Sequence, residues 1–157
     1  MLPLKVCISE KYAQSLLANG QAIPQPVEGV GLIDTGAAHS SVDETIIRSL
    51  GAKSVGSREY GGASGIRKHA TYAVTFVFPG DIVYRFADMG SVQLAENNRP
   101  GAIPLIALIG RDILANCLLV YNGMTGRYKL TVEKSNDEEL WVENASDPSG
   151  SSALHDR

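Results

Sequence analysis

An aspartate with two small neighbours, Asp34, Thr35 and Gly36, directly follows an apolar stretch that ends with Leu32 and Ile33. A carboxylate at the end of a buried strand is costly to desolvate unless it is paired or hydrogen-bonded. Glycine lets the backbone turn sharply and lets another chain approach it closely. The pattern therefore has two interpretations: a strand that ends in a tight turn, or a catalytic carboxylate held among small residues.

A second motif lies near residue 110 and favours the catalytic interpretation. Residues 32–37 resemble the active-site strand and turn of the retropepsin-like aspartic proteases. The second motif resembles that family's strand-to-helix motif near the C-terminus, and it reads Leu108-Ile109-Gly110-Arg111-Asp112-Ile113-Leu114. The order and separation of the two motifs are similar to those of a family protomer, and the resemblance covers roughly residues 2–133.

The resemblance implies a fold that is mainly β. The expected protomer is a closed, barrel-like sheet of the retropepsin-like acid protease fold with one or two short helices, as in a single-domain, retroviral-type member from a cellular or bacterial source. Residues 1–133 would form the protease domain, since 157 residues suffice for one core of this kind. Residues 134–157 are predicted to be a largely disordered polar tail, because the chain from residue 144 onward lacks apolar periodicity.

The resemblance also implies an activity, that of an endopeptidase whose catalytic residues are Asp34, Thr35 and Gly36. In aspartic proteases two carboxylates share one proton, because groups about 3 Å apart do not both ionise easily. The ionised one accepts a proton from water, and the other donates to the peptide carbonyl oxygen. This chain has one Asp-Thr-Gly sequence, so a second copy would supply the other Asp34 across a two-fold axis. By this resemblance Thr35 would link the two turns, the alternative being that its hydroxyl bonds within its own turn, and Gly36 would approach the substrate backbone.

Small residues at two places are expected to contact an extended peptide substrate. Ala37 and Ala38 follow the catalytic turn. Residues 60–66 are too rich in glycine for a stable helix or a rigid strand, so they form either an ordinary flexible loop or the tip of a flap over the cleft. The resemblance favours the flap, because family members place a glycine-rich hairpin here. It assigns to substrate binding Gly61, Gly62, Ala63, Ser64 and Gly65.

Gly110, Arg111 and Asp112 match the Gly-Arg-Asp motif of the family, and they are expected to be structural residues near the site. In many retroviral members the arginine pairs with an acidic residue shortly after the catalytic turn. That position is Ala38 in this chain. Arg111 is therefore expected to hold Asp112, Asp43 or a backbone carbonyl instead.

Other chemistries find little support in the sequence, and no cofactor is predicted. Cys7 and Cys117 lack metal-type spacing, and neither His39 nor His69 belongs to a cluster of metal ligands. A metal site is therefore not expected. A serine hydrolase is disfavoured too, because the serines at residues 40 and 41 are not in a Gly-x-Ser-x-Gly sequence.

Composition and charge point to no nucleic-acid or membrane partner. The formal net charge is −3, and no basic stripe is evident. No stretch approaches the roughly 18 apolar residues of a membrane span, and the first residues lack the apolar run of a signal peptide. The sequence thus predicts a soluble, cytoplasmic protein whose partners are a second copy of itself and a peptide or protein substrate.

Periodicity and turn residues predict the remaining elements. Ser9 is the expected N-cap of a helix that Gly20 ends, and Ser41 or Asp43 is the expected N-cap of a second helix that Gly51 ends. Hairpin turns are expected at residues 79–80 and 122–123. Strands are predicted for residues 2–8, 27–33, 71–78, 81–86, 92–95, 105–109, 118–121 and 127–132, and helices for residues 10–19, 43–50 and 111–116.

Three classes of function remain to be weighed. The leading one is a homodimeric aspartic endopeptidase. The second is a peptide-binding module of the same fold with weak or no turnover, which the intact Asp34-Thr35-Gly36 sequence disfavours. The third, a phosphate- or nucleotide-binding domain, would need a longer chain, and its Gly-x-x-x-x-Gly-Lys-Ser/Thr motif is missing.

Overall fold

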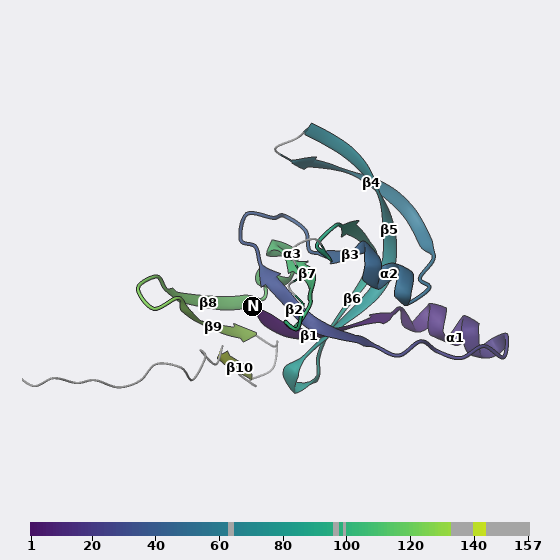
Figure 1. Ribbon diagram of the computed structural model, residues 1–157, viewed down its shortest axis with the longest axis horizontal. Coiled ribbons are helices and arrows are strands. Elements are labelled where there is room, and N and C mark those ends of the chain that lie inside the picture. Colours follow the sequence, from purple (N-terminus) through teal and green to yellow (C-terminus); the bar gives the residue numbers. More distant parts are fainter. Residues whose placement is uncertain (63–64, 96–97, 99, 133–139, 144–157) are drawn as a thin grey trace, which may run out of the picture. The chain divides into compact units, whose positions relative to one another are not determined.

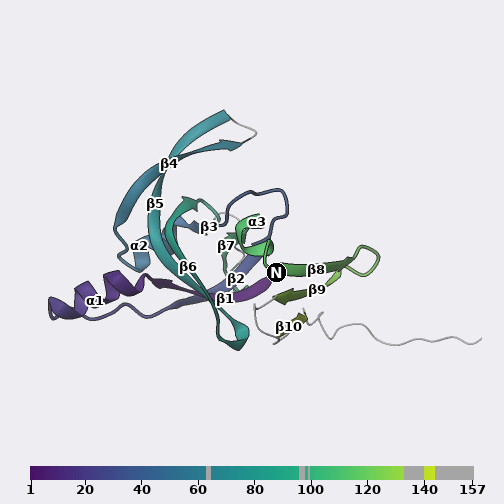
Figure 2. The same cartoon turned by 180° about the vertical axis from the view of Figure 1, so that it is seen from behind.

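A computed structural model describes residues 1–62, 65–95, 98, 100–132 and 140–143 (Figures 1 and 2). The chain forms two compact units, the first spanning residues 1–116 and the second residues 117–157. The domain boundary predicted at residue 133 lies inside the second unit.

Six strands of the first unit close into a β-barrel. Their order is β1-β2-β7-β3-β6-β5, and β5 pairs again with β1 to complete the ring. The predictions of a mainly β chain and of a closed barrel are confirmed. The barrel strands are β1 (Leu2–Ile8), β2 (Val27–Ile33), β3 (Ser41–Asp43), β5 (Gly65–Phe78), β6 (Ile82–Val92) and β7 (Leu105–Ile109).

The barrel core follows from strand alternation. Along β1, every second side chain is buried and the intervening ones are exposed or half-buried. The same pattern recurs in β5, where Val74, Phe76 and Phe78 point inward. Burial of a large apolar side chain contributes about 1.5–3 kcal/mol, so the inward residues supply most of the stability. The most deeply buried large apolar residues are Val6, Val42, Val74, Phe76, Ile106, Ile109, Ile113 and Leu130, the last of which belongs to the second unit.

At one end of the β1–β5 pairing, two prolines interrupt the hydrogen-bonded ladder and leave an open corner in the barrel. The β1–β5 ladder runs from Ile8 opposite Val74 to Lys5 opposite Val77. Continuing this register would set Pro3 opposite Pro79. Neither proline has a backbone N–H to donate, so the ladder ends there.

Helices begin where the polar residues predict. The Ser9 Oγ atom accepts a hydrogen bond from Tyr12 N at 3.3 Å, and the Asp43 Oδ1 atom accepts one from Thr45 N at 2.8 Å. These contacts confirm Ser9 and Asp43 as N-caps. The helices are α1 (Glu10–Ala18), α2 (Glu44–Ser49) and α3 (Arg111–Leu114), and a short 3₁₀ turn, η1 (Pro79–Asp81), joins β5 to β6.

Asp43 also ties α2 to the far end of β6. It is 1% exposed, and its Oδ2 atom accepts hydrogen bonds from Leu94 N at 2.6 Å and Ala95 N at 2.9 Å. Residues 92–95 were predicted as a strand, but β6 ends at Val92. The backbone N–H groups of Leu94 and Ala95 donate to the Asp43 carboxylate and not to a neighbouring strand. Burial raises the pKa of Asp43, but the hydrogen bonds from Thr45, Leu94 and Ala95 outweigh it and hold the pKa below its ordinary value.

Replacement of Asp43 by asparagine is expected to lower the free energy of unfolding by about 3 kcal/mol at pH 7, since the amide would set its own donor against buried N–H groups. The folded-state pKa lies below the unfolded value. The carboxylate therefore stabilises the fold above roughly pH 4 and loses this effect as the pH falls through the folded pKa. Urea unfolding at neutral and acid pH measures both effects. A difference between the two proteins that stays constant down to acid pH would contradict this role.

The second unit contains a three-stranded antiparallel sheet in the order β10-β9-β8. The Asn122 Oδ1 atom accepts hydrogen bonds from Met124 N at 3.0 Å and Thr125 N at 3.2 Å, so the predicted turn is present. Residues 140–143 of the predicted disordered tail form a strand. The rest of the stretch from 134 onward lies outside the described residues. The strands are β8 (Cys117–Asn122), β9 (Arg127–Val132) and β10 (Leu140–Glu143).

Candidate active site

The Asp34 carboxylate is held by the turn that follows β2. The Asp34 Oδ1 atom accepts hydrogen bonds from Gly36 N at 2.9 Å and Ala37 N at 3.1 Å. A Cβ atom at Gly36 would lie 3.2 Å from the same oxygen, so any other residue would crowd the carboxylate. Among the described residues, the Asp34 Oδ2 atom has no hydrogen-bond partner. One oxygen thus fixes the side chain, and the other is available to a ligand.

The neighbouring strand β7 holds the Asp34 turn through a backbone hydrogen bond. β2 and β7 run parallel, and Asp34 N donates to Ile109 O at 2.9 Å just beyond the last strand pair. A Cβ atom at Gly31 would lie 2.8 Å from the Ile109 Cγ1 atom, so glycine is what allows the two strands to pack this closely. The two sequence motifs are therefore neighbours in space, as the resemblance implies.

Arg111 braces the turn through backbone carbonyls. Its Nη1 atom lies 3.3 Å from Thr35 O and 3.5 Å from Gly36 O, and its own N–H donates to Ala37 O at 3.0 Å. Of the three predicted partners of Arg111, the backbone carbonyl is therefore the one that the structure contains. The guanidinium supports the Asp34 turn, and it has no acidic partner among the described residues.

Ser40 and Asp112 lock the segment after the turn to the start of α3. The Asp112 carboxylate accepts hydrogen bonds from Ser40 N at 2.8 Å and 2.9 Å and from Ser40 Oγ at 2.5 Å. Gly110 N donates to Ser40 Oγ at 2.9 Å. A Cβ atom at Gly110 would lie 2.6 Å from the carbonyl carbon of His39, which explains the glycine. Sequence reasoning found Gly110 and Asp112 but missed Ser40.

Thr35 is exposed next to the carboxylate. Its hydroxyl forms no hydrogen bond with any residue in the described ranges. The alternative in which Thr35 satisfies its own turn is therefore not what the structure contains. Ala38 is also exposed and Ala37 is half-buried, while Leu32 is 43% exposed just before the turn.

The glycine-rich stretch belongs to a long hairpin of β4 (Ser54–Gly62) and β5, which extends beyond the barrel in both views (Figures 1 and 2). Gly61 pairs with Ile66, and Gly62 with Gly65, so both strands continue almost to the tip. The expectation that this stretch is too glycine-rich for a strand is therefore wrong for Gly61, Gly62 and Gly65, while the expected hairpin is present. Ala63 and Ser64, which were assigned to substrate binding, lie outside the described residues. No hydrogen bond among the described residues joins this hairpin to the Asp34 turn.

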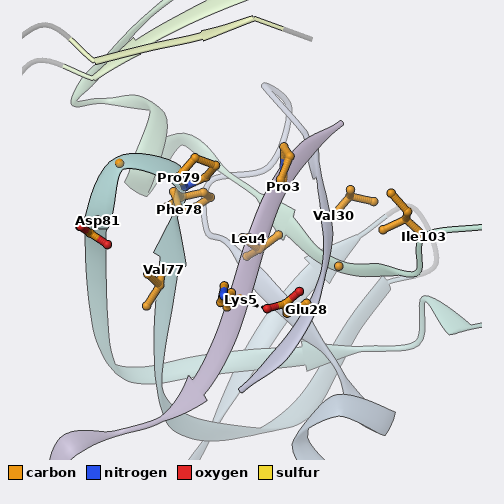
Figure 3. A pocket seen from close by; sticks show the side chains of 12 residues that line it. Pro3, Leu4, Lys5, Glu28, Val30, Val77, Phe78, Pro79, Asp81 and Ile103 are labelled. Carbon is orange, nitrogen blue, oxygen red and sulfur yellow. Dashed lines mark ion pairs between the residues drawn. The ribbon is translucent and has the colours of Figure 1, made fainter. Parts of the chain in front are cut away.

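Two hollows of the first unit lie away from this turn. One has a volume of about 460 Å³ near the start of β2, and Asp34 follows the other end of that strand (Figure 3). The other has a volume of about 290 Å³ beside α1. Neither is lined by a residue that the sequence assigned to catalysis. In the part of the chain that the structure describes, no three His, Cys, Asp or Glu side chains are grouped to hold a metal ion, and no helix there is long and apolar enough to cross a membrane.

Comparisons with protein-family models, with curated proteins and with solved structures found no match.

Proposed function

We propose that this protein is a retropepsin-like aspartic endopeptidase that hydrolyses peptide bonds as a homodimer. The observation that carries the proposal is the Asp34 turn. It presents a carboxylate whose Oδ1 atom is held by Gly36 N and Ala37 N, at the junction of β2 and β7. A rigidly oriented carboxylate with one available oxygen is what general acid–base catalysis on a bound water requires.

A single chain supplies only half of the catalytic pair. Asp112, the nearest acidic residue in the paired motif, is occupied by Ser40 N and Ser40 Oγ. The second carboxylate of the proposed pair is therefore Asp34 of another copy, related by a two-fold axis. Thr35 supports this arrangement, because its exposed hydroxyl is left to bond across the axis.

The proposed reaction needs no cofactor. The ionised Asp34 accepts a proton from the water as its oxygen attacks the peptide carbonyl carbon, and the protonated Asp34 donates to the carbonyl oxygen. As the tetrahedral intermediate collapses and its C–N bond breaks, the proton gained from water passes to the leaving amine nitrogen. One hydroxyl of the intermediate returns a proton to the Asp34 that had donated, which restores the starting pair. Gly36 and Ala37 would lie along the substrate backbone, and the β4–β5 hairpin would cover it as a flap.

The runner-up function is a peptide-binding module of the same fold without turnover. A module that only binds gains nothing from two facing carboxylates, whose mutual repulsion opposes assembly. The peptidase is therefore the better proposal. The cytoplasmic location that the sequence favours is kept as part of it.

Assembly offers the direct test of this function. Specific activity on a mixed peptide library is expected to fall as the protein is diluted, in step with the dimer fraction seen by sedimentation velocity, because each monomer holds one catalytic carboxylate. The two curves should share a midpoint. A strictly monomeric sample with full activity per chain would rule out the shared site.

A further inference from the structure

The cleft at the open corner of the barrel is a second candidate site, far along β2 from the Asp34 turn. It forms where the β1–β5 ladder stops, between Pro3 on β1 and Pro79 after β5. Its volume of about 460 Å³ is in the range of about 300–1,000 Å³ that is usual for ligand sites.

Most of its wall is apolar. Figure 3 shows Ile103 at one end of the lining residues and Asp81 at the other, with β1 crossing between them. Ile103 is 69% exposed, and a side chain of this size gains from being covered. The apolar lining consists of Pro3, Leu4, Val30, Val77, Phe78, Pro79 and Ile103.

The charge that is left in the cleft is negative. Lys5 and Glu28 neutralise each other through an ion pair of 2.7 Å, drawn as a dashed line in Figure 3. Asp81 is exposed, and it forms no ion pair within the described ranges. The prolines at residues 3 and 79 contribute carbonyls but no N–H groups, so these two wall residues can only accept hydrogen bonds. The complementary ligand is rich in donors and positively charged.

Asp81 belongs to the turn between β5 and β6. Its φ angle is 58°, in the left-handed region. Aspartate and asparagine adopt this region more readily than most residues and are common in turns, so the charge of Asp81 can be removed without changing its backbone.

We propose that this cleft binds a short, extended peptide segment that carries apolar side chains and one arginine or lysine. The apolar groups cover Ile103 and the proline walls, and the cationic group lies against Asp81. The site is separate from the Asp34 turn, and the proposal does not depend on peptidase activity.

The test uses the full-length chain with Asp34→Asn, so that no probe is cleaved whatever the enzyme does. The probe is fluorescein-labelled acetyl-Leu-Pro-Leu-Arg-Leu-Pro-amide, and two matched probes carry norleucine or glutamate in place of arginine. Fluorescence anisotropy gives the affinities. Amide chemical shifts locate the bound probe, with Lys5, Gly29 and Val77 as reporters of the cleft.

Asp81→Asn is the informative variant, because asparagine tolerates the left-handed conformation and only the charge is lost. It is expected to weaken the arginine probe about five-fold and to leave the norleucine probe unchanged. Asp88→Asn is the matched control, since it removes an exposed carboxylate that pairs with Arg58 outside the cleft. Ile103→Ser should weaken both probes roughly ten-fold.

Three results would overturn the proposal. In the first, the arginine and glutamate probes bind equally well, or neither binds. In the second, Asp88→Asn weakens binding as much as Asp81→Asn, or the shifts centre on Gly36 and Ala37. In the third, Ile103→Ser converts a dimer to a monomer and no probe binds, which would assign the cleft to a second copy of the chain.

Discussion

Replacement of Asp34 by asparagine is expected to abolish peptide cleavage, with a loss of at least about 10³-fold in kcat/KM. Asparagine has nearly the same shape, and its side-chain oxygen can still accept from Gly36 N and Ala37 N, as Oδ1 does in the wild type. The turn should therefore survive. The amide carries no negative charge and cannot take a proton from water. Initial rates on a mixed peptide library measure the effect.

Circular dichroism and the sedimentation mass serve as folding controls for this variant. Asp88→Asn is the matched control for activity, because it removes an exposed carboxylate on β6. Dimers of the Asp34 variant should be at least as stable as the wild type, since the repulsion between facing carboxylates is gone. A folded, dimeric variant that still cleaves would remove Asp34 from the mechanism.

Replacement of Gly110 by alanine is expected to lower the free energy of unfolding by about 3 kcal/mol or more. The new Cβ atom would lie 2.6 Å from the His39 carbonyl carbon and 2.7 Å from its oxygen. The neighbouring backbone cannot easily retreat, because Asp112 holds Ser40 N and Ser40 Oγ. Urea unfolding at pH 7 gives the difference.

Gly61→Ala is the matched control for this loss. A Cβ atom at Gly61 would meet nothing within 4 Å, so the free energy of unfolding should change by less than about 0.5 kcal/mol. The Gly110 variant should also lose activity while still folded, because the displaced His39–Ser40 segment leads directly from the Asp34 turn. Equal free energies of unfolding for the two variants would contradict this prediction. They would show that the backbone at His39 can shift to accommodate the new Cβ atom.

Local signals in the sequence predicted much of this structure. Ser9 and Asp43 identified helix starts because an N-cap contact spans only two or three residues. The turn after Asn122 and the bounds of β9 follow from equally local chemistry. The meeting of the Asp34 and Gly110 motifs was predicted from family resemblance alone, not from any local rule.

Features that depend on distant partners were missed. Ser40 is 72 residues away from Asp112 in the sequence. The residues next to Ser40 form no motif that predicts its hydrogen bonds to Asp112. β3 has only three residues, of which Ser41 and Asp43 are polar, so it carries no strand periodicity. Asp43 was expected to cap a helix, as an alternative to Ser41, or to pair with Arg111. Its bonds to the amides of Leu94 and Ala95 also explain why the apolar residues after Val92 leave the sheet.

The place of β7 between β2 and β3 determines when, during synthesis, the carboxylate turn can form. Asp34 N finds its partner only at Ile109 O, near the end of the first unit. At about 5–20 residues per second, several seconds separate the translation of these two residues. Until then β2 and β3 each keep an open edge, which makes the nascent chain a target for strand pairing with other chains. The barrel closes and Asp34 N gains its partner in the same step, so a chain translated only as far as β6 has neither.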